Sequence, residues 1–186
     1  MEIGTYPLEK TSIFQGANAQ QVQKMLGVIL PSIKTYARGE TICRAGETVS
    51  SLGIVLAGGA TIELCDAWGN RSIIERLEPG EVFAEAYACL PGEPLMVSVT
   101  ADAPTRVMFL GVSRMLSMGL EPEQAILTTN LLRIMARKNV TLSQRMMNIS
   151  ARTIRARLLS YLSQQAIRTG SSRFTIPFNR QELADY

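Results

Sequence analysis

The chain has 186 residues, of which 46% are hydrophobic and 19% are charged, and its formal net charge at pH 7 is +3. This composition predicts a folded protein with one ordinary core and a smaller second unit, and it excludes extended disorder. The sequence contains no histidine, so zinc enzymes, two-histidine iron sites and Ser–His catalysis lose their usual ligand or base. We therefore expect a protein that is not an enzyme, with no catalytic residues, no metal site and no cofactor.

The N-terminal residues and the cysteines bear on the cell compartment. Met1–Tyr6 has no basic stretch followed by an apolar run, and no apolar segment reaches the ~18–20 residues of a membrane span. Cys43, Cys65 and Cys89 are odd in number and widely spaced, without a CxxC pair, which suits a reducing compartment and structural thiols. We expect a cytoplasmic protein with no membrane partner.

The first two-thirds of the chain predict a β-structure preceded by helix. Thr11 to Leu30 has the pattern of one or two short helices that end at Pro31. From Ile33 onward, short β-type runs alternate with glycine-containing turns, a pattern typical of an antiparallel sandwich or barrel. The main predicted strands are 52–56, 60–64, 71–77, 95–100 and 105–110.

After Ser113 the hydrophobic period becomes helical, with a short turn of helix over 114–118 and a long helix to about Ile149. Pro122 suits the first turn of the long helix, and Glu121 and Glu123 complement its dipole. Seven positions recur at alternating spacings of four and three, the seam of a two-stranded coiled coil. They are Thr128, Leu132, Met135, Asn139, Leu142, Met146 and Ile149.

A second apolar stripe on the same helix comprises Leu127, Leu131 and Ile134. Two apolar faces need two partners, so we expect this stripe to pack on the strands and the seam to pair with another copy of the chain. The alternative is that the two stripes form a single broad apolar face that packs in the core of one chain. Polar Asn139 on the seam favours the paired helices, because a polar seam residue commonly sets register.

The C-terminal part predicts two further helices around a short strand. Ser150 is a candidate cap for a helix over Arg152 to Ile167, and Phe174 to Phe178 can form a strand. Asn179 and Glu182 form a variant capping box, so another helix is expected to begin at Arg180.

Basic residues concentrate in this part of the chain. Ten Lys or Arg lie from Arg133 to Arg180, and no acid lies between Glu123 and Glu182. Such a bias is typical of a module that meets phosphate, although a solvated basic face produces the same pattern.

Several segments together resemble a known family. They are Gly39-Glu40-Thr41-Ile42, Ala45-Gly46-Glu47, Gly58 to Ile62, Asp66 to Gly69 and Leu77-Glu78-Pro79-Gly80-Glu81-Val82-Phe83-Ala84-Glu85. In order and spacing they resemble the cyclic-nucleotide-binding β-roll, over roughly Ile33 to Leu110. With the long helix and Phe178 to Tyr186, which resembles the first helix of a helix-turn-helix, the chain resembles the Crp/Fnr transcription regulators.

The resemblance implies an α+β fold: an N-terminal antiparallel β-roll of the jelly-roll kind with flanking helices, a long dimerisation helix and a partial winged-helix domain. The implied boundaries are 1–120 for the sensor, 121–150 for the dimerisation helix and 151–186 for the incomplete DNA-binding domain. It implies a homodimer that binds DNA and a small-molecule effector, which shifts the population between two dimer geometries.

For DNA binding, the resemblance implies a phosphate contact at Arg180, next to Gln181. The base-reading helix of the family would follow Tyr186. The 186 residues alone are therefore not expected to bind an operator specifically.

The implied effector site departs from the family pattern. The Gly-Glu pair of cyclic-nucleotide binders falls on Ala84 and Glu85, and the Arg-Ser pair on Leu95 and Met96. Without the guanidinium a buried phosphate has no counter-charge, so cyclic AMP is not expected as effector. We expect an apolar cavity for a small uncharged or weakly acidic ligand, with Tyr87, Cys89, Leu142 and Ser143 nearby. A cavity filled by its own side chains is the alternative.

Other functions stay open beside the regulator. A stand-alone ligand-binding signalling module would leave the basic, capped tail unexplained. Iron–sulfur sensing needs an N-terminal cysteine cluster, and no cysteine precedes Cys43. Haem sensing would have to use Cys or Met ligands.

Overall fold

The computed structural model describes residues 6–65, 71–117, 122–149 and 154–178. The helices are η1 (Leu8–Lys10), α1 (Ala19–Ile29), α2 (Glu85–Ala88), α3 (Val112–Leu116), α4 (Pro122–Ile149) and α5 (Ile154–Thr169). The strands are β1 (Ser32–Tyr36), β2 (Thr41–Cys43), β3 (Ser51–Ala57), β4 (Ala60–Cys65), β5 (Arg71–Leu77), β6 (Val82–Phe83), β7 (Ser98–Ala101) and β8 (Thr105–Gly111).

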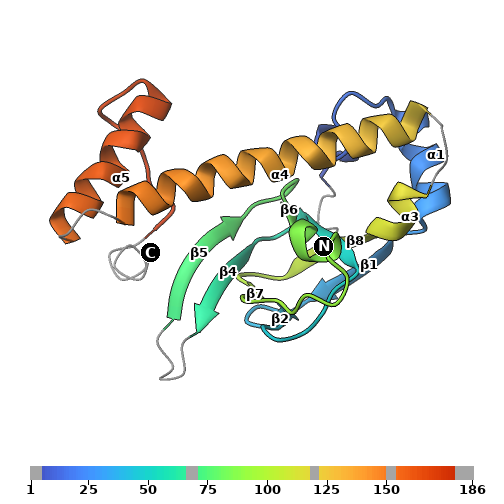
Figure 1. Cartoon of the computed structure of the whole chain (residues 1–186), viewed down its shortest axis with the longest axis horizontal. Helices are drawn as coiled ribbons and strands as arrows, with labels where there is room; N and C mark the ends of the chain where they lie inside the picture. Colours follow the sequence, from blue (N-terminus) through green and yellow to red (C-terminus); the bar gives the residue numbers. More distant parts are fainter. Residues whose placement is uncertain (1–5, 66–70, 118–121, 150–153, 179–186) are drawn as a thin grey trace.

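The strands form two four-stranded antiparallel sheets, in the orders β1-β8-β3-β6 and β2-β7-β4-β5. In Figure 1 the strands lie below the long α4 helix, with α1 and α3 near its start and α5 near its end. This arrangement is the expected α+β fold with an antiparallel β-roll and a long helix.

Alternate residues of β3 and β8 face two different cores. Leu52, Ile54 and Leu56 pack with the helices, whereas Val55 and Val107 pack with the second sheet. Successive side chains of a strand point to opposite faces, so these two strands join both cores. The run Leu52–Ala57 is buried throughout, which explains why it reads as a continuous apolar segment rather than an alternating one.

Gly53 permits the close approach of β6 to β3. A Cβ atom at this position would lie 2.2 Å from Phe83 Cζ, so any side chain larger than hydrogen would displace the ring. Phe83 in turn meets Phe109 edge-to-face, with ring centroids 6.3 Å apart. The segment that leads from β6 into α2 is therefore held firmly on the sheet.

The first half of α4 is anchored in the same core as α1 and the sheet. Leu127, Leu131 and Ile134 are buried there, as the second stripe predicted. Asn130 is also buried, and its side-chain amide donates to the Ile13 carbonyl at 3.1 Å and the Gln15 carbonyl at 2.8 Å. The helix is thus fixed to the N-terminal loop by polar as well as apolar contacts.

The predicted strands over 52–56, 60–64, 71–77 and 105–110 are confirmed as β3, β4, β5 and β8. The predicted strand over 95–100 begins only at Ser98, as β7. The long helix predicted from Glu121 or Glu123 to about Ile149 is confirmed as α4, and the helix predicted over Arg152 to Ile167 is confirmed as α5.

The predicted strand from Phe174 to Phe178 is wrong, because this segment has no regular structure. A strand requires a partner for its backbone groups, and no strand in the described part of the chain pairs with it. Phe178 instead lies 6.4 Å from the Tyr161 ring and 6.0 Å from the Arg76 guanidinium. A winged-helix domain is not evident in the described residues, and the predicted helix from Arg180 lies outside them.

Candidate effector-binding site

A cavity of about 370 Å³ lies between the β-roll and α4. Most of its lining is apolar and comes from β4, β5, the segment that leads into β7, α2 and α4. The lining residues are Ile62, Ile74, Glu75, Ala84, Glu85, Ala86, Tyr87, Leu95, Val97, Val99, Met135, Lys138, Asn139, Thr141 and Leu142. We call it the effector cavity.

The backbone at the entrance of α2 has the conformation that glycine favours. Ala84 precedes the helix with φ 58° and ψ 13°, in the left-handed region. For a residue with a Cβ atom this conformation costs roughly 1–2 kcal/mol. Ala84 thus adopts a glycine-like backbone conformation at the position where the family resemblance implies a glycine.

Glu85, the next residue, is buried and already has a cationic partner. Lys138 of α4 lies with its Nζ 3.1 Å from Glu85 Oε2, and the same ammonium donates to the Val82 carbonyl at 2.7 Å. The Glu85 side chain is only 5% exposed and that of Lys138 is 30% exposed. This ion pair joins α2 and the end of β6 to the long helix.

The residue expected, from the family resemblance, at the arginine position of cyclic-nucleotide binders is part of the core. Leu95 is 3% exposed and packs with the residues between the two sheets. Glu75, Glu85 and Lys138 are the acidic and basic side chains of the lining, and their formal charges sum to −1. A buried phosphate would therefore meet a lining of the wrong sign, with its one ammonium already engaged.

Of the effector-site residues predicted from the sequence, the structure brings five together around the cavity: Ala84, Glu85, Tyr87, Leu95 and Leu142. Met96 and Ser143 do not line it, and neither does Cys89, which was also expected nearby. The Met96 side chain is 70% exposed, and its backbone N–H donates to the Tyr87 hydroxyl at 3.4 Å. The Ser143 hydroxyl donates to the Asn139 carbonyl at 3.0 Å.

Sequence reasoning missed Glu75 on the strand side of the cavity and Met135, Lys138 and Asn139 on the helix side. Helical periodicity contained a signal for the last three, because they lie seven, four and three residues before Leu142. No comparable signal marked Glu75, whose position depends on how β5 approaches α4.

The predicted dimerisation seam is largely exposed on α4. Leu132, Leu142 and Met146 are 68%, 54% and 72% exposed. Thr128 and Asn139 are also exposed, Met135 is half-buried, and the side chain of Ile149 lies outside the described residues. Three seam residues, Met135, Asn139 and Leu142, also line the effector cavity.

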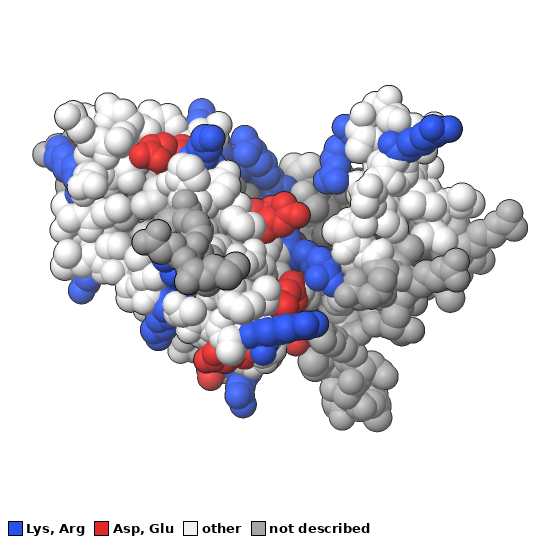
Figure 2. Space-filling model, turned by 180° about the vertical axis from the view of Figure 1, so that it is seen from behind, with Lys and Arg blue, Asp and Glu red and all other residues white. Residues whose placement is uncertain are grey.

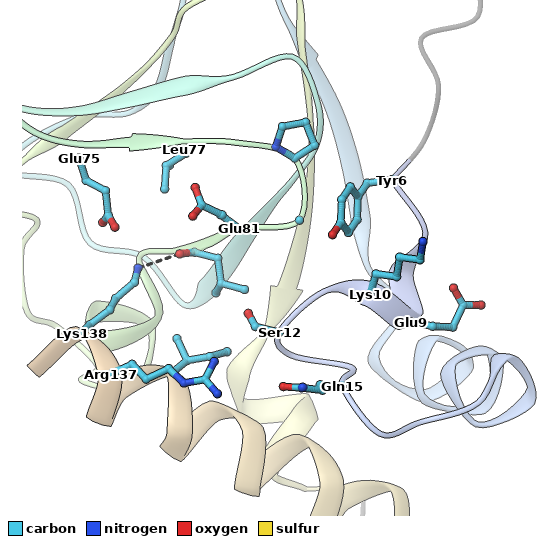
Figure 3. A pocket seen from close by; sticks show the side chains of 14 residues that line it. Tyr6, Glu9, Lys10, Ser12, Gln15, Glu75, Leu77, Glu81, Arg137 and Lys138 are labelled. Carbon is cyan, nitrogen blue, oxygen red and sulfur yellow. Dashed lines mark hydrogen bonds between the residues drawn. The ribbon is translucent and has the colours of Figure 1, made fainter. Parts of the chain in front are cut away.

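A second cavity, of about 600 Å³, adjoins the first (Figure 3). Glu75 and Glu81 lie on its strand side, Arg137 and Lys138 on its helix side, and Tyr6 on its N-terminal side. Desolvation raises the pKa of the Glu81 carboxyl, although a hydrogen bond from the Glu78 N–H opposes this, and the Glu75 and Glu78 carboxylates raise it further. We call this second cavity the polar groove.

Arg180 and Gln181, predicted to contact DNA, lie outside the described residues. Figure 2 shows lysine and arginine side chains, without acidic ones, on the lobe that contains α5. This agrees with the absence of acids between Glu123 and Glu182.

The described cysteines are poorly suited to reaction or metal binding. Burial raises the pKa of the Cys43 thiol to about 11, and burial also raises the pKa of Cys89. The described residues contain no group of three potential metal ligands, and none of their helices has the length and apolarity to cross a bilayer.

Comparison with known proteins agrees with this architecture. The family model described as the cyclic nucleotide-binding domain matches residues 33–120. The structural neighbours are transcription regulators of the Crp/Fnr type, and the resemblance recognised in the sequence is confirmed. A search of curated proteins found no significant match.

Three solved structures illustrate the likeness. The catabolite activator protein of Thermus thermophilus has a TM-score of 0.61 at 21% identity, over 94% of this chain and 78% of that one. The c-di-GMP-responsive global regulator CLP of Xanthomonas campestris has a TM-score of 0.66 at 12% identity, over 90% and 84%. The N-terminal domain of a Streptomyces coelicolor A3(2) transcriptional regulator has 0.58 at 24% identity, over 73% and 93%. At these identities the likeness is one of fold.

Proposed function

We propose that the protein is a non-enzymatic, homodimeric transcription regulator of the Crp/Fnr type that acts on DNA in the cytoplasm. In this proposal residues 1–120 sense a small effector, 121–150 pair two copies, and 151–186 begin the DNA-binding domain. The observation that carries it is that three residues of the predicted seam on α4, Met135, Asn139 and Leu142, line the effector cavity, which would give α4 a double role.

The proposed mechanism follows from that double role. A ligand in the effector cavity contacts the side of α4 that also faces the second copy, so it changes the relative stability of alternative helix pairings. The α4 helix has 28 residues and extends about 42 Å at about 1.5 Å per residue, far enough to transmit a change in pairing towards α5. Such an effect requires only that the ligand bind one dimer geometry more tightly.

The effector is not cyclic AMP in this proposal. Leu95 replaces the arginine that would neutralise the phosphate, and Lys138 is held by Glu85. Thermal melting with and without cyclic AMP tests this point. We expect no shift in Tm with the nucleotide, and a concentration-dependent rise would overturn the exclusion.

The homodimer is tested by sedimentation of seam variants. The changes Leu132→Glu and Leu142→Glu, made separately, place a carboxylate in the proposed apolar interface and should each weaken self-association by at least about tenfold. Val140→Glu is the matched control, because Val140 is 57% exposed on α4 but lies off the seam.

The wild type and Val140→Glu should sediment as dimers and both seam variants as monomers at the same concentration. A monomeric wild type, or seam variants as dimeric as the control, would refute this interface. The stand-alone signalling module would be favoured by a dimer that binds no DNA at low salt, because the basic tail should bind duplex DNA non-specifically with a steep salt dependence.

A further inference from the structure

The effector cavity and the polar groove share two residues, Glu75 and Lys138. They therefore meet at this pair, which comes from β5 on one side and α4 on the other. The effector cavity provides apolar surface from residues such as Leu95 and Val99, whereas the groove combines charged and hydroxyl groups with apolar ones. A ligand at the junction is exposed to both environments.

The ion pair at the junction selects against an anionic ligand. Lys138 is the sole lysine or arginine that lines the effector cavity among the described residues, and both Glu85 and the Val82 carbonyl hold it. An anion could recruit this ammonium only by leaving the buried Glu85 carboxylate without its partner, a costly exchange.

The junction is more favourable to a cationic ligand. Glu75 makes no ion pair with any side chain that the structure describes, and it faces both cavities. Glu81 follows on the groove side, where Figure 3 shows both carboxylates on the strand side. Lys10 and Arg137 face the groove from the N-terminal segment and α4 but do not line the effector cavity.

We infer that the effector is an amphipathic amine, with its apolar body in the effector cavity and its protonated nitrogen beside Glu75 at the junction. This inference rests on the proposed function, because it assumes that this cavity is the sensing site. It makes Glu75 the residue that selects the charge of the ligand, and it replaces the uncharged or weakly acidic ligand expected from the sequence with a cationic one.

Three probes of one shape test the inference: 2-phenylethylamine, 2-phenylethanol and phenylacetate, titrated calorimetrically into the full chain at neutral pH. A partly buried, charge-assisted hydrogen bond should make the amine bind about tenfold more tightly than the alcohol. Phenylacetate should bind more weakly than the alcohol. Glu75→Gln should weaken amine binding by about tenfold while changing alcohol binding by less than about twofold.

The alcohol serves as the control for folding of the variant, since it needs the cavity but not the carboxylate. Glu93→Gln is the matched charge control, because Glu93 is exposed and lines neither cavity. Tighter binding of phenylacetate, equal loss of amine and alcohol in Glu75→Gln, or no binding of any probe would overturn the inference. None of these results bears on dimerisation or DNA binding, whose failure would instead appear in sedimentation and in duplex titration.

Discussion

The two apolar faces of α4 both carry leucine, but one face is buried and the other is exposed. Leu127 and Leu131 are 1% and 5% exposed against the β-roll and α1, whereas Leu132 and Leu142 are 68% and 54% exposed on the next face. The difference shows that leucine residues on a helix do not by themselves indicate what the helix packs against. The inner face stabilises the single chain, and the outer face contributes only when something else covers it.

The largest expected effect is on the inner face. Leu127→Ala removes a fully enclosed side chain and should lower the free energy of unfolding by about 2–5 kcal/mol, measured by urea denaturation. Leu132→Ala is the control on the outer face and should change the stability of the monomer by no more than about 0.5 kcal/mol. Similar losses in both variants would mean that the outer face is also covered within one chain.

The second effect compares two asparagines on the two faces. Asn130→Leu leaves the Ile13 and Gln15 carbonyls without their donor and should lower the free energy of unfolding by about 1–3 kcal/mol. Asn139→Leu removes an exposed amide and should leave the stability of the monomer nearly unchanged in the same denaturation experiment. A smaller loss for Asn130→Leu than for Asn139→Leu would contradict the assignment of the faces.

The third variant changes Ala84, which immediately precedes Glu85, the partner of Lys138 of α4 in the ion pair. Ala84→Gly removes the penalty of the left-handed backbone but adds entropy to the unfolded chain, so we expect a net gain of at most about 1 kcal/mol. Leu30→Gly, at the other non-glycine residue with positive φ among those that the structure describes, controls for the backbone effect away from the cavity. Destabilisation by Ala84→Gly alone would show that the Ala84 methyl group packs usefully in the cavity wall.

The smallest effect concerns the first turn of α4, where Glu123 pairs with Lys24 at 3.3 Å. The Glu123 backbone N–H and Lys24 hold the pKa of this carboxyl below its ordinary value. Because the folded-state pKa is lowered, the stabilisation is present above the unfolded-state pKa and is lost as the pH falls through the folded-state pKa. Urea denaturation of the wild type and Glu123→Gln should give curves that converge as the solution is acidified. A constant difference would exclude this linkage.

Much of the architecture could be predicted because its signals are local. Glycine-containing turns between short apolar runs predicted the strands, and the two interleaved stripes predicted α4 with both of its faces. The strand predicted over Phe174 to Phe178 failed because a strand depends on a neighbour elsewhere in the chain. Phe178, the last residue of that segment, lies instead near Tyr161 and Arg76, and no periodicity in the sequence indicates these contacts.

The candidate site was predictable only in part for the same reason. Ala84, Glu85, Tyr87, Leu95 and Leu142 could be named because they follow a family motif or a helical repeat. The ion pair between Glu85 and Lys138 joins residues 53 positions apart, and nothing in either neighbourhood predicts the other. That pair decides the charge that the cavity offers, and hence the class of ligand we propose.

The amino-acid sequence by itself determined the antiparallel roll, the long helix and the apolar stripe of α4 that packs in the core, because turn residues and apolar periods are read from residues close together in the chain. The tertiary structure alone decided where Glu75 stands between two cavities and which carboxylate lies beside Lys138. Those features depend on distances between segments far apart in the chain, and such distances are set by packing.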